Sequence, residues 1–200
     1  MKELFKTDLG LPPLHNSCGC DHRGPVFDYV AIDDGFAIAT DAHQMVVADL
    51  YAFISEEEIS MLNGYLIHKD DWKFMIEFLK KHNNIGEIKV IDNHYLKVTT
   101  AFRAITFRLE TAENMKFPNW KNVWPTEIKM SSEFKGRIEF DTSLLSKIKK
   151  SFGDKNTVVH FALNDRNKAI LVYPKELLGI AAILSPVMFS DIPEFSIKRN

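Results

Sequence analysis

Thr40, Asp41 and His43 are the residues of this chain whose types and spacing most resemble a hydrolytic set. In such a set, Asp41 would orient His43 as a general base. Neighbouring strand residues point to opposite faces, so the two side chains could converge only at a turn. A turn in which the Asp41 carboxylate accepts backbone N–H groups explains this aspartate more simply. We therefore predict no catalytic residue and no enzyme activity, with a hydrolase using Asp41 and His43 as the alternative.

A second group, His15, Cys18, Cys20 and His22, combines thiols and imidazoles that zinc favours. Structural zinc sites usually separate two ligand pairs by a loop, and this group is too compact for that arrangement. We therefore predict a disordered or locally packed loop, no metal and no cofactor. The chain's two cysteines are too close for an unstrained disulfide, which favours a reduced pair in the cytoplasm.

The composition is that of an ordinary globular protein, with 200 residues, 46% hydrophobic and 26% charged. The formal net charge of −2 implies no overall attraction to phosphate, so nucleic-acid contact would need a local basic patch. No apolar run is long enough to cross a bilayer, and the N-terminus lacks a secretory signal. These features predict a cytoplasmic protein without a membrane partner.

The elements that position these residues follow from periodicity and turn chemistry. Residues 1–25 contain scattered glycines and prolines and are predicted to be irregular. Residues 26–50 predict a β-hairpin with Asp33-Asp34-Gly35 at its turn, and residues 45–52 could form a further strand.

A β-α-β-β-β pattern then occurs twice. Strands are expected at 64–68, 87–91, 95–99 and 102–109 in the first unit, and at 137–140, 157–163, 168–173 and 180–185 in the second. Each helix carries apolar residues at helical spacing: Trp72, Met75, Ile76 and Leu79, then Leu144, Leu145, Ile148 and Phe152. The short connections predict antiparallel sheets with two helices on one face, an α+β fold. We place boundaries at 1–25, 26–125 and 126–200, with a proline-rich connector before the second unit.

Four motifs in register resemble the bacterial DNA polymerase III sliding clamp (β subunit) family. They are Asp21 to Val26, Ala39-Thr40-Asp41-Ala42-His43-Gln44-Met45, Phe117-Pro118-Asn119-Trp120 through Pro125, and Ala182 to Met188. Ala42 stands where the family has Gly, Gln44 where it has Arg, and Trp120 where it has Tyr. A full clamp chain has three domains of two units each, so this chain is similar to a shortened clamp with a DNA-clamp-like fold.

The resemblance implies a hydrophobic pocket that takes short linear peptides of replication or repair proteins. Carried over by motif, its residues would be Thr40, Ala42, His43, Gln44, Met45, Pro118, Asn122, Val123, Leu184, Ser185, Pro186, Val187 and Met188.

The family's helices also carry basic residues toward double-stranded DNA. Here the resemblance implies sequence-independent contacts from Lys69, Lys73, Lys80, Lys147 and Lys150, and a ring would need several copies, a homo-oligomer. The alternative for these lysines is a solvated helix face with pairs such as Lys73 with Glu77. The alternative function is a monomeric interaction module, for instance a mobile-element clamp mimic or competitor that does not encircle DNA.

Overall fold

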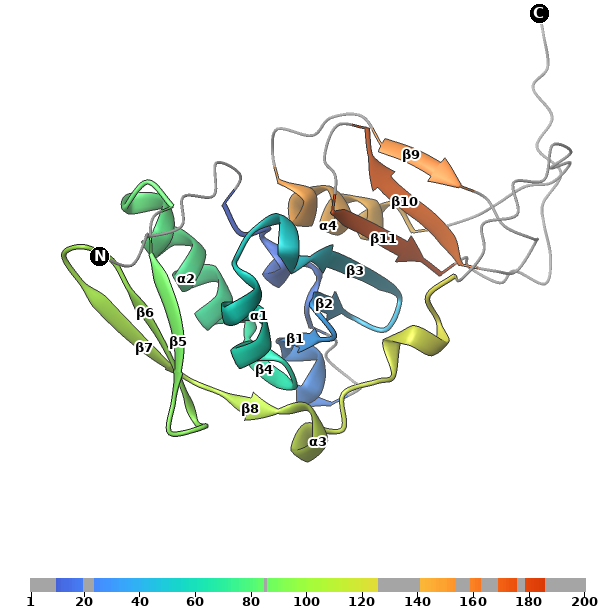
Figure 1. Cartoon of the computed structure of the whole chain (residues 1–200). Coiled ribbons are helices and arrows are strands. Elements are labelled where there is room, and N and C mark those ends of the chain that lie inside the picture. Colours follow the sequence, from blue (N-terminus) through green and yellow to red (C-terminus); the bar gives the residue numbers. More distant parts are fainter. Residues whose placement is uncertain are drawn as a thin grey trace, which may run out of the picture.

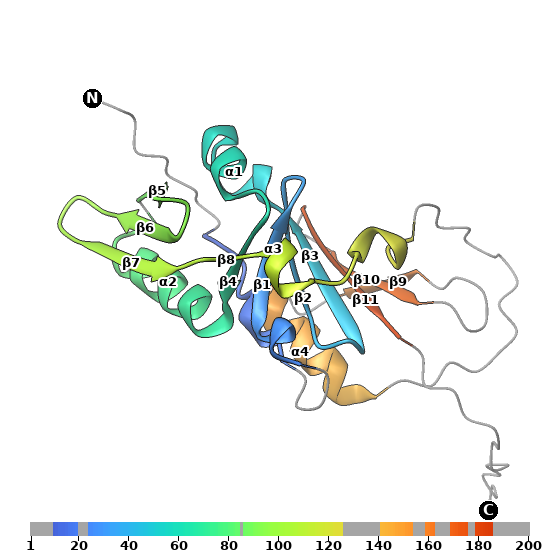
Figure 2. The ribbon, with the colours of Figure 1, turned by 90° about the horizontal axis from the view of Figure 1, so that it is seen from below.

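A computed structural model describes residues 10–19, 24–84, 86–125, 141–153, 159–162, 169–175 and 179–185. These residues form an eight-stranded antiparallel sheet and a separate three-stranded antiparallel sheet. The long helices α2 and α4 lie on the same side of the larger sheet (Figures 1 and 2). The predicted α+β class with antiparallel sheets is confirmed.

The first three strands are neighbours in the middle of the larger sheet. They are β1 (Tyr29–Asp33), β2 (Phe36–Thr40) and β3 (Gln44–Asp49). Asp34 and Gly35 both have positive φ, 52° and 81°, the backbone of the tight turn that suits a two-residue hairpin. The predicted hairpin is confirmed, although Val26 and Phe27 belong to the 3-10 turn η2 (Pro25–Asp28) instead of β1.

The larger sheet joins distant parts of the chain, in the order β8-β4-β1-β2-β3-β11-β10-β9. Its other strands are β4 (Tyr65–His68), β8 (Glu110–Thr111), β9 (Val159–Ala162), β10 (Ile170–Pro174) and β11 (Ile180–Leu184). The pairing of β3 with β11 sets Met45 opposite Ile183. The last described strand therefore completes a sheet that the first strands begin.

The smaller sheet consists of β5 (Glu87–Ile91), β6 (Tyr95–Thr99) and β7 (Ala104–Arg108). The predicted helices are present as α2 (Lys69–Lys81) and α4 (Thr142–Phe152). The Asp141 side chain caps α4 by accepting from Ser143 N at 2.7 Å, and this bond lowers the pKa of the Asp141 carboxyl. The expected strand at 137–140 lies outside the described residues.

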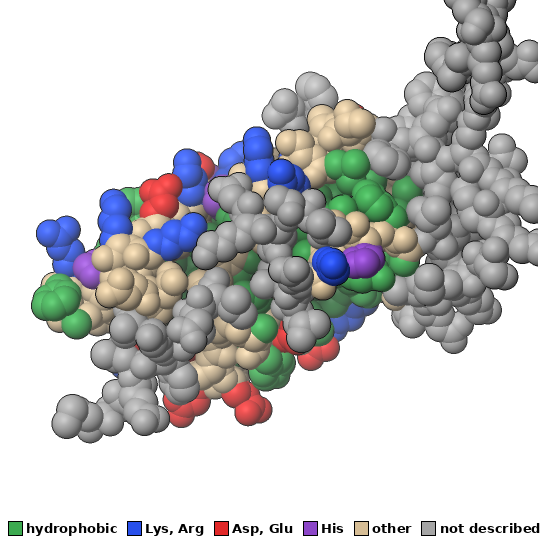
Figure 3. Space-filling model, turned by 90° about the horizontal axis from the view of Figure 1, so that it is seen from above, with side chains coloured by type: hydrophobic (Ala, Val, Ile, Leu, Met, Phe, Trp, Pro, Cys, Tyr) green, Lys and Arg blue, Asp and Glu red, His purple; other side chains and the backbone are tan. Residues whose placement is uncertain are grey.

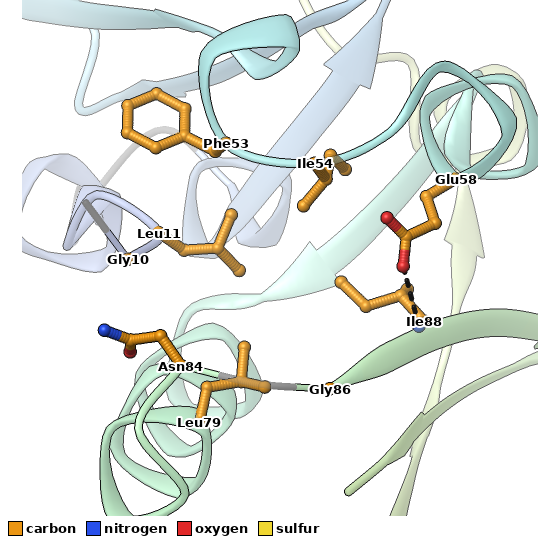
Figure 4. A pocket seen from close by; sticks show the side chains of 9 residues that line it. All are labelled: Gly10, Leu11, Phe53, Ile54, Glu58, Leu79, Asn84, Gly86 and Ile88. Atoms are coloured by element: carbon orange, nitrogen blue, oxygen red, sulfur yellow. Dashed lines mark hydrogen bonds between the residues drawn. The ribbon is translucent and has the colours of Figure 1, made fainter. Parts of the chain in front are cut away.

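Helix α1 (Glu56–Leu62) was not expected from the sequence. Its N-terminus is a capping box, in which Glu58 N donates to Ser55 Oγ and Ser55 N donates to Glu58 Oε2. The other carboxylate oxygen of Glu58 accepts from Ile88 N at 3.0 Å, in a small pocket between α1 and β5 (Figure 4). One buried carboxylate therefore holds the start of α1 against the start of β5.

Replacing Glu58 by Ala is expected to lower the free energy of unfolding by about 2 kcal/mol, because several backbone and hydroxyl donors lose their acceptor. Urea denaturation measures the change. Glu57→Ala is the matched control, since Glu57 is exposed in the same helical turn. Equal effects of the two substitutions would contradict the role assigned to Glu58.

The N-terminal segment is part of the main core, which the prediction of an irregular region did not anticipate. Leu11 and Leu14 are buried among residues of α2, α4 and both sheets, and the 3-10 turn η1 (Leu14–Ser17) contacts both helices. Trp72 Nε1 donates to Pro12 O at 2.9 Å, and the hydroxyls of Ser17 and Ser151 lie 2.6 Å apart. Residues 10–19 thus form a wedge between α2 and α4.

The opposite face of the larger sheet carries a second hydrophobic cluster that includes Ile38, Met45, Val47 and Ile183. The connector after β8 covers part of this face through α3 (Ala112–Met115) and the 3-10 turn η4 (Trp120–Asn122). Within the described ranges, no helix has the length and apolar character needed to span a membrane.

Candidate functional site

Asp41 organises the turn between β2 and β3, and it is only 2% exposed. Its Oδ1 accepts from the backbone N–H groups of His43 and Gln44, each at 3.0 Å. Thr40 Oγ1 accepts from Ala42 N at 3.0 Å and donates to Gln44 O at 2.7 Å. The predicted backbone-bonding role of Asp41 is confirmed, and its carboxylate is not bonded to the His43 ring.

Ala42 occupies the tip of this turn with φ of 71°, the left-handed region that favours glycine. We expect Ala42→Gly to raise the free energy of unfolding by about 0.5 kcal/mol, because the Cβ strain disappears. Differential scanning calorimetry would measure it. Ala181→Gly is the control, because Ala181 lies in the extended strand β11, and this substitution should lower stability. If Ala42→Gly lowered stability by the same amount, Ala42 would not be strained by its positive φ.

Lys147 of α4 lies against the inner side of the turn. Its Nζ is 2.6 Å from Asp41 Oδ2, and the Asp41 side chain is 3% exposed while that of Lys147 is 41% exposed. The carboxylate therefore holds the turn with one oxygen and α4 with the other. Lys147 was expected at a DNA-facing surface, and in the structure its ammonium group is paired with Asp41.

The end of β11 lies beside the same turn. Ser185 N donates to His43 O at 3.0 Å, and Met45 and Ile183 belong to the same hydrophobic cluster. Leu184 is buried in the main core, and Gln44 Nε2 donates to Ser17 O at 3.0 Å, so both side chains lie on the helix side of the sheet, away from Met45. The expected pocket residues Pro186, Val187 and Met188 lie outside the described residues.

The connector is fixed near the opposite end of β2. Trp120 Nε1 donates to Asp33 Oδ2 at 2.8 Å, and Lys121 Nζ lies 3.2 Å from Asp34 Oδ2. Trp120 belongs to the same cluster as Met45. Of the expected pocket residues in this connector, Pro118 is half-buried, whereas Asn122 and Val123 are exposed. The structure thus brings the turn and the end of β11 together, and it places the connector over the same sheet face.

The helix lysines fall into two groups. Lys69 Nζ lies 2.6 Å from Asp28 Oδ1, and that hydrogen bond raises the pKa of Lys69. Lys73, Lys80 and Lys150 are exposed and form no ion pair within the described part of the chain. These three remain available to an anion, together with the neighbouring Lys81 and Lys149, which were not among the expected contacts.

The His15 and Cys18 side chains lie in the N-terminal wedge. Burial lowers the pKa of His15, with Lys73 adding to the effect, and burial raises the pKa of the Cys18 thiol. No group of three or more potential ligands for a metal ion occurs among the residues that the structure describes, while Cys20 and His22 lie outside them.

Comparison with known proteins gives similarity in structure only. No family model matches the sequence, and no curated protein matches it. Among solved structures, a Pseudomonas aeruginosa DNA polymerase sliding clamp with ligand matches with a TM-score of 0.68 at 15% identity, covering 93% of this chain and 65% of that chain. This chain has the sliding-clamp fold.

Other clamps agree. The DNA polymerase III subunit beta of Borrelia burgdorferi, in complex with a natural product, gives a TM-score of 0.64 at 11% identity, over 94% of this chain and 64% of that one. A Pseudomonas aeruginosa clamp bound to griselimycin gives a TM-score of 0.65 at 14% identity, over 94% of this chain and 65% of that one. The chain thus spans about two thirds of the length of these clamps, and the expected similarity to a shortened clamp is confirmed for the fold.

Proposed function

We propose that this chain is a non-enzymatic clamp-like protein that docks short linear peptides on the sheet face between the β2–β3 turn and the connector. The docking surface comprises Ala42, His43 and Ser185 together with the nearly buried Thr40 and Met45 on one side, and Pro118, Asn122 and Val123 on the other.

The observation that carries the proposal is the joining of the turn to the end of β11. Ser185 N donates to His43 O, and Met45 lies opposite Ile183 across the two strands, so segments far apart in the sequence lie side by side. Methionine and proline side chains adapt to apolar peptide residues, while exposed His43 and Asn122 offer polar contacts at the rim.

Titration of peptides of the Gln-x-x-hydrophobic type, followed by NMR, tests the proposal. Shifts are expected at Ala42, His43, Met45 and Ser185. Met45→Ala should weaken binding by about tenfold or more, because a buried apolar contact is lost. Val90→Ala, in the other sheet, is the matched control. Absence of shifts at the turn would refute the peptide-docking surface.

Contact with double-stranded DNA is the second part of the proposal. It is supported by Lys73, Lys80 and Lys150 on the helix side, which have no described acidic partner. Replacing all three by Ala should weaken the binding of a DNA duplex and reduce its salt dependence. Duplex binding identical to that of the unaltered protein would remove this part.

A monomeric docking module is the second candidate, because Lys69 and Lys147 are engaged with Asp28 and Asp41. Light scattering over a concentration series separates the two. A discrete closed oligomer supports a ring of copies. A monomer at all concentrations, with no salt-dependent retention of DNA, supports docking without encirclement.

A further inference from the structure

An aromatic stripe lies on the outer end of the molecule, away from the proposed peptide surface. Phe74, Phe78 and His82 follow one another at four-residue spacing along α2 and its C-cap, so they share one helix face. The His82 ring lies 5.0 Å from Phe78 and 6.4 Å from Phe102, which belongs to the turn between β6 and β7. We name these four residues the aromatic stripe.

The two ends of this stripe are open to solvent. Phe102 is 85% exposed and Phe74 is 52% exposed, whereas Phe78 is buried and holds the stripe to the core. Phe74 also packs edge-on against Phe107 of β7, with ring centroids 6.1 Å apart. Two exposed aromatic rings at the ends of one stripe offer apolar surface on which a partner can bind.

Cationic residues lie near the Phe102 end of the aromatic stripe. Lys80 and Lys81 lie in the last turn of α2, and Arg103 follows Phe102 directly. All three are exposed, and none has an ion-pair partner among the described residues. Glu77 is the nearest acidic residue of the helix, one turn before Lys81. At the left end of Figure 3, hydrophobic side chains lie beside a histidine and several Lys or Arg side chains.

We propose that the aromatic stripe binds single-stranded nucleic acid, with bases stacked on Phe102 and Phe74 and the phosphates near Lys81 and Arg103. A single strand supplies both components that this surface requires, flat base faces and regularly spaced negative charge. A duplex offers the charge but keeps its base faces stacked inside. A protein partner would have to supply acidic residues and an apolar centre at matching positions, whereas a single strand carries both components along its length.

The test measures fluorescence anisotropy of a labelled 20-nucleotide dT oligomer and of a duplex of equal length. Phe102→Ala should weaken binding of the oligomer by at least about fivefold, because one stacked base is lost, and leave duplex binding unchanged. Because Phe102 is exposed, its replacement should not change the folding of the protein. Tyr51→Ala is the matched control, since Tyr51 is 59% exposed elsewhere on the surface. Lys81→Ala with Arg103→Ala should reduce the salt dependence of oligomer binding.

If Phe102→Ala bound the dT oligonucleotide as tightly as the unaltered protein does, the proposal would be overturned. So would a concentration-dependent molar mass that Phe102→Ala abolishes, because the stripe would then be a contact between copies. The stripe does not depend on the peptide surface. Binding of the dT oligonucleotide without binding of the peptide would refute only peptide docking. Binding of the peptide without binding of the oligonucleotide would refute only this inference.

Discussion

Asp41→Ala is expected to lower the free energy of unfolding by about 2–4 kcal/mol, one of the largest effects of any single polar substitution in this chain. The change removes the acceptor of the His43 and Gln44 N–H groups and the anionic partner of Lys147. Because the turn connects β2 to β3, its loosening should also reduce peptide binding. Urea denaturation and the peptide titration measure the two effects.

Two variants separate the contributions. Asp41→Asn keeps an acceptor for the turn but loses the charge toward Lys147, so its cost should lie between zero and that of Asp41→Ala. Asp34→Asn removes the charge of a carboxylate that is 73% exposed and paired with Lys121, keeps a side chain that tolerates the positive φ there, and should cost no more than about 0.5 kcal/mol. If Asp41→Ala cost as little as Asp34→Asn, the turn would not depend on its buried carboxylate.

Trp72→Ala is expected to cost about 3–5 kcal/mol, since Trp72 is 1% exposed and fills the space where α2 meets the N-terminal wedge. The indole also donates to Pro12 O, so the substitution removes both packing and the hydrogen bond that fixes residues 10–19. Chemical denaturation measures the cost, and limited proteolysis followed by mass spectrometry reports whether the wedge detaches.

Trp72→Phe distinguishes the hydrogen bond from the packing. It keeps most of the ring volume and removes the indole donor to the Pro12 carbonyl, which still accepts from Leu14 N, so a loss of about 1–2 kcal/mol is expected. Cleavage within residues 10–19 should increase in both variants. Unchanged cleavage in Trp72→Ala would show that the wedge is held by its other contacts, such as Leu14 and Ser17.

The elements that the sequence predicts correctly are those with a strong local signal. The apolar spacing of Trp72, Met75, Ile76 and Leu79 identifies α2, and Asp34-Gly35 identifies the hairpin turn. Helix α1 was not predicted because it has only two turns. Ser55 followed by Glu58 is a capping-box signature that could have identified it. The N-terminal wedge has no periodicity, and only tertiary contacts give Leu11 and Leu14 their buried positions.

The candidate site shows the same division. The turn chemistry of Asp41 is local and followed from its position before His43. The partner of that carboxylate, Lys147, is distant in sequence, and no local pattern distinguishes it from the exposed lysines of α4. Likewise, strand alternation places Met45 and Gln44 on opposite faces, but only the position of the wedge shows which face is the interior.

The pairing of β3 with β11 has a consequence for biosynthesis. The chain emerges from the ribosome N-terminus first, so β3 remains without its β11 neighbour until β11 has followed. Contacts of such long sequence separation form late and slowly. The surface beside the β2–β3 turn is thus completed only after β11 has been synthesised, so a nascent chain that stops before β11 would present an unpaired strand edge in place of a finished surface.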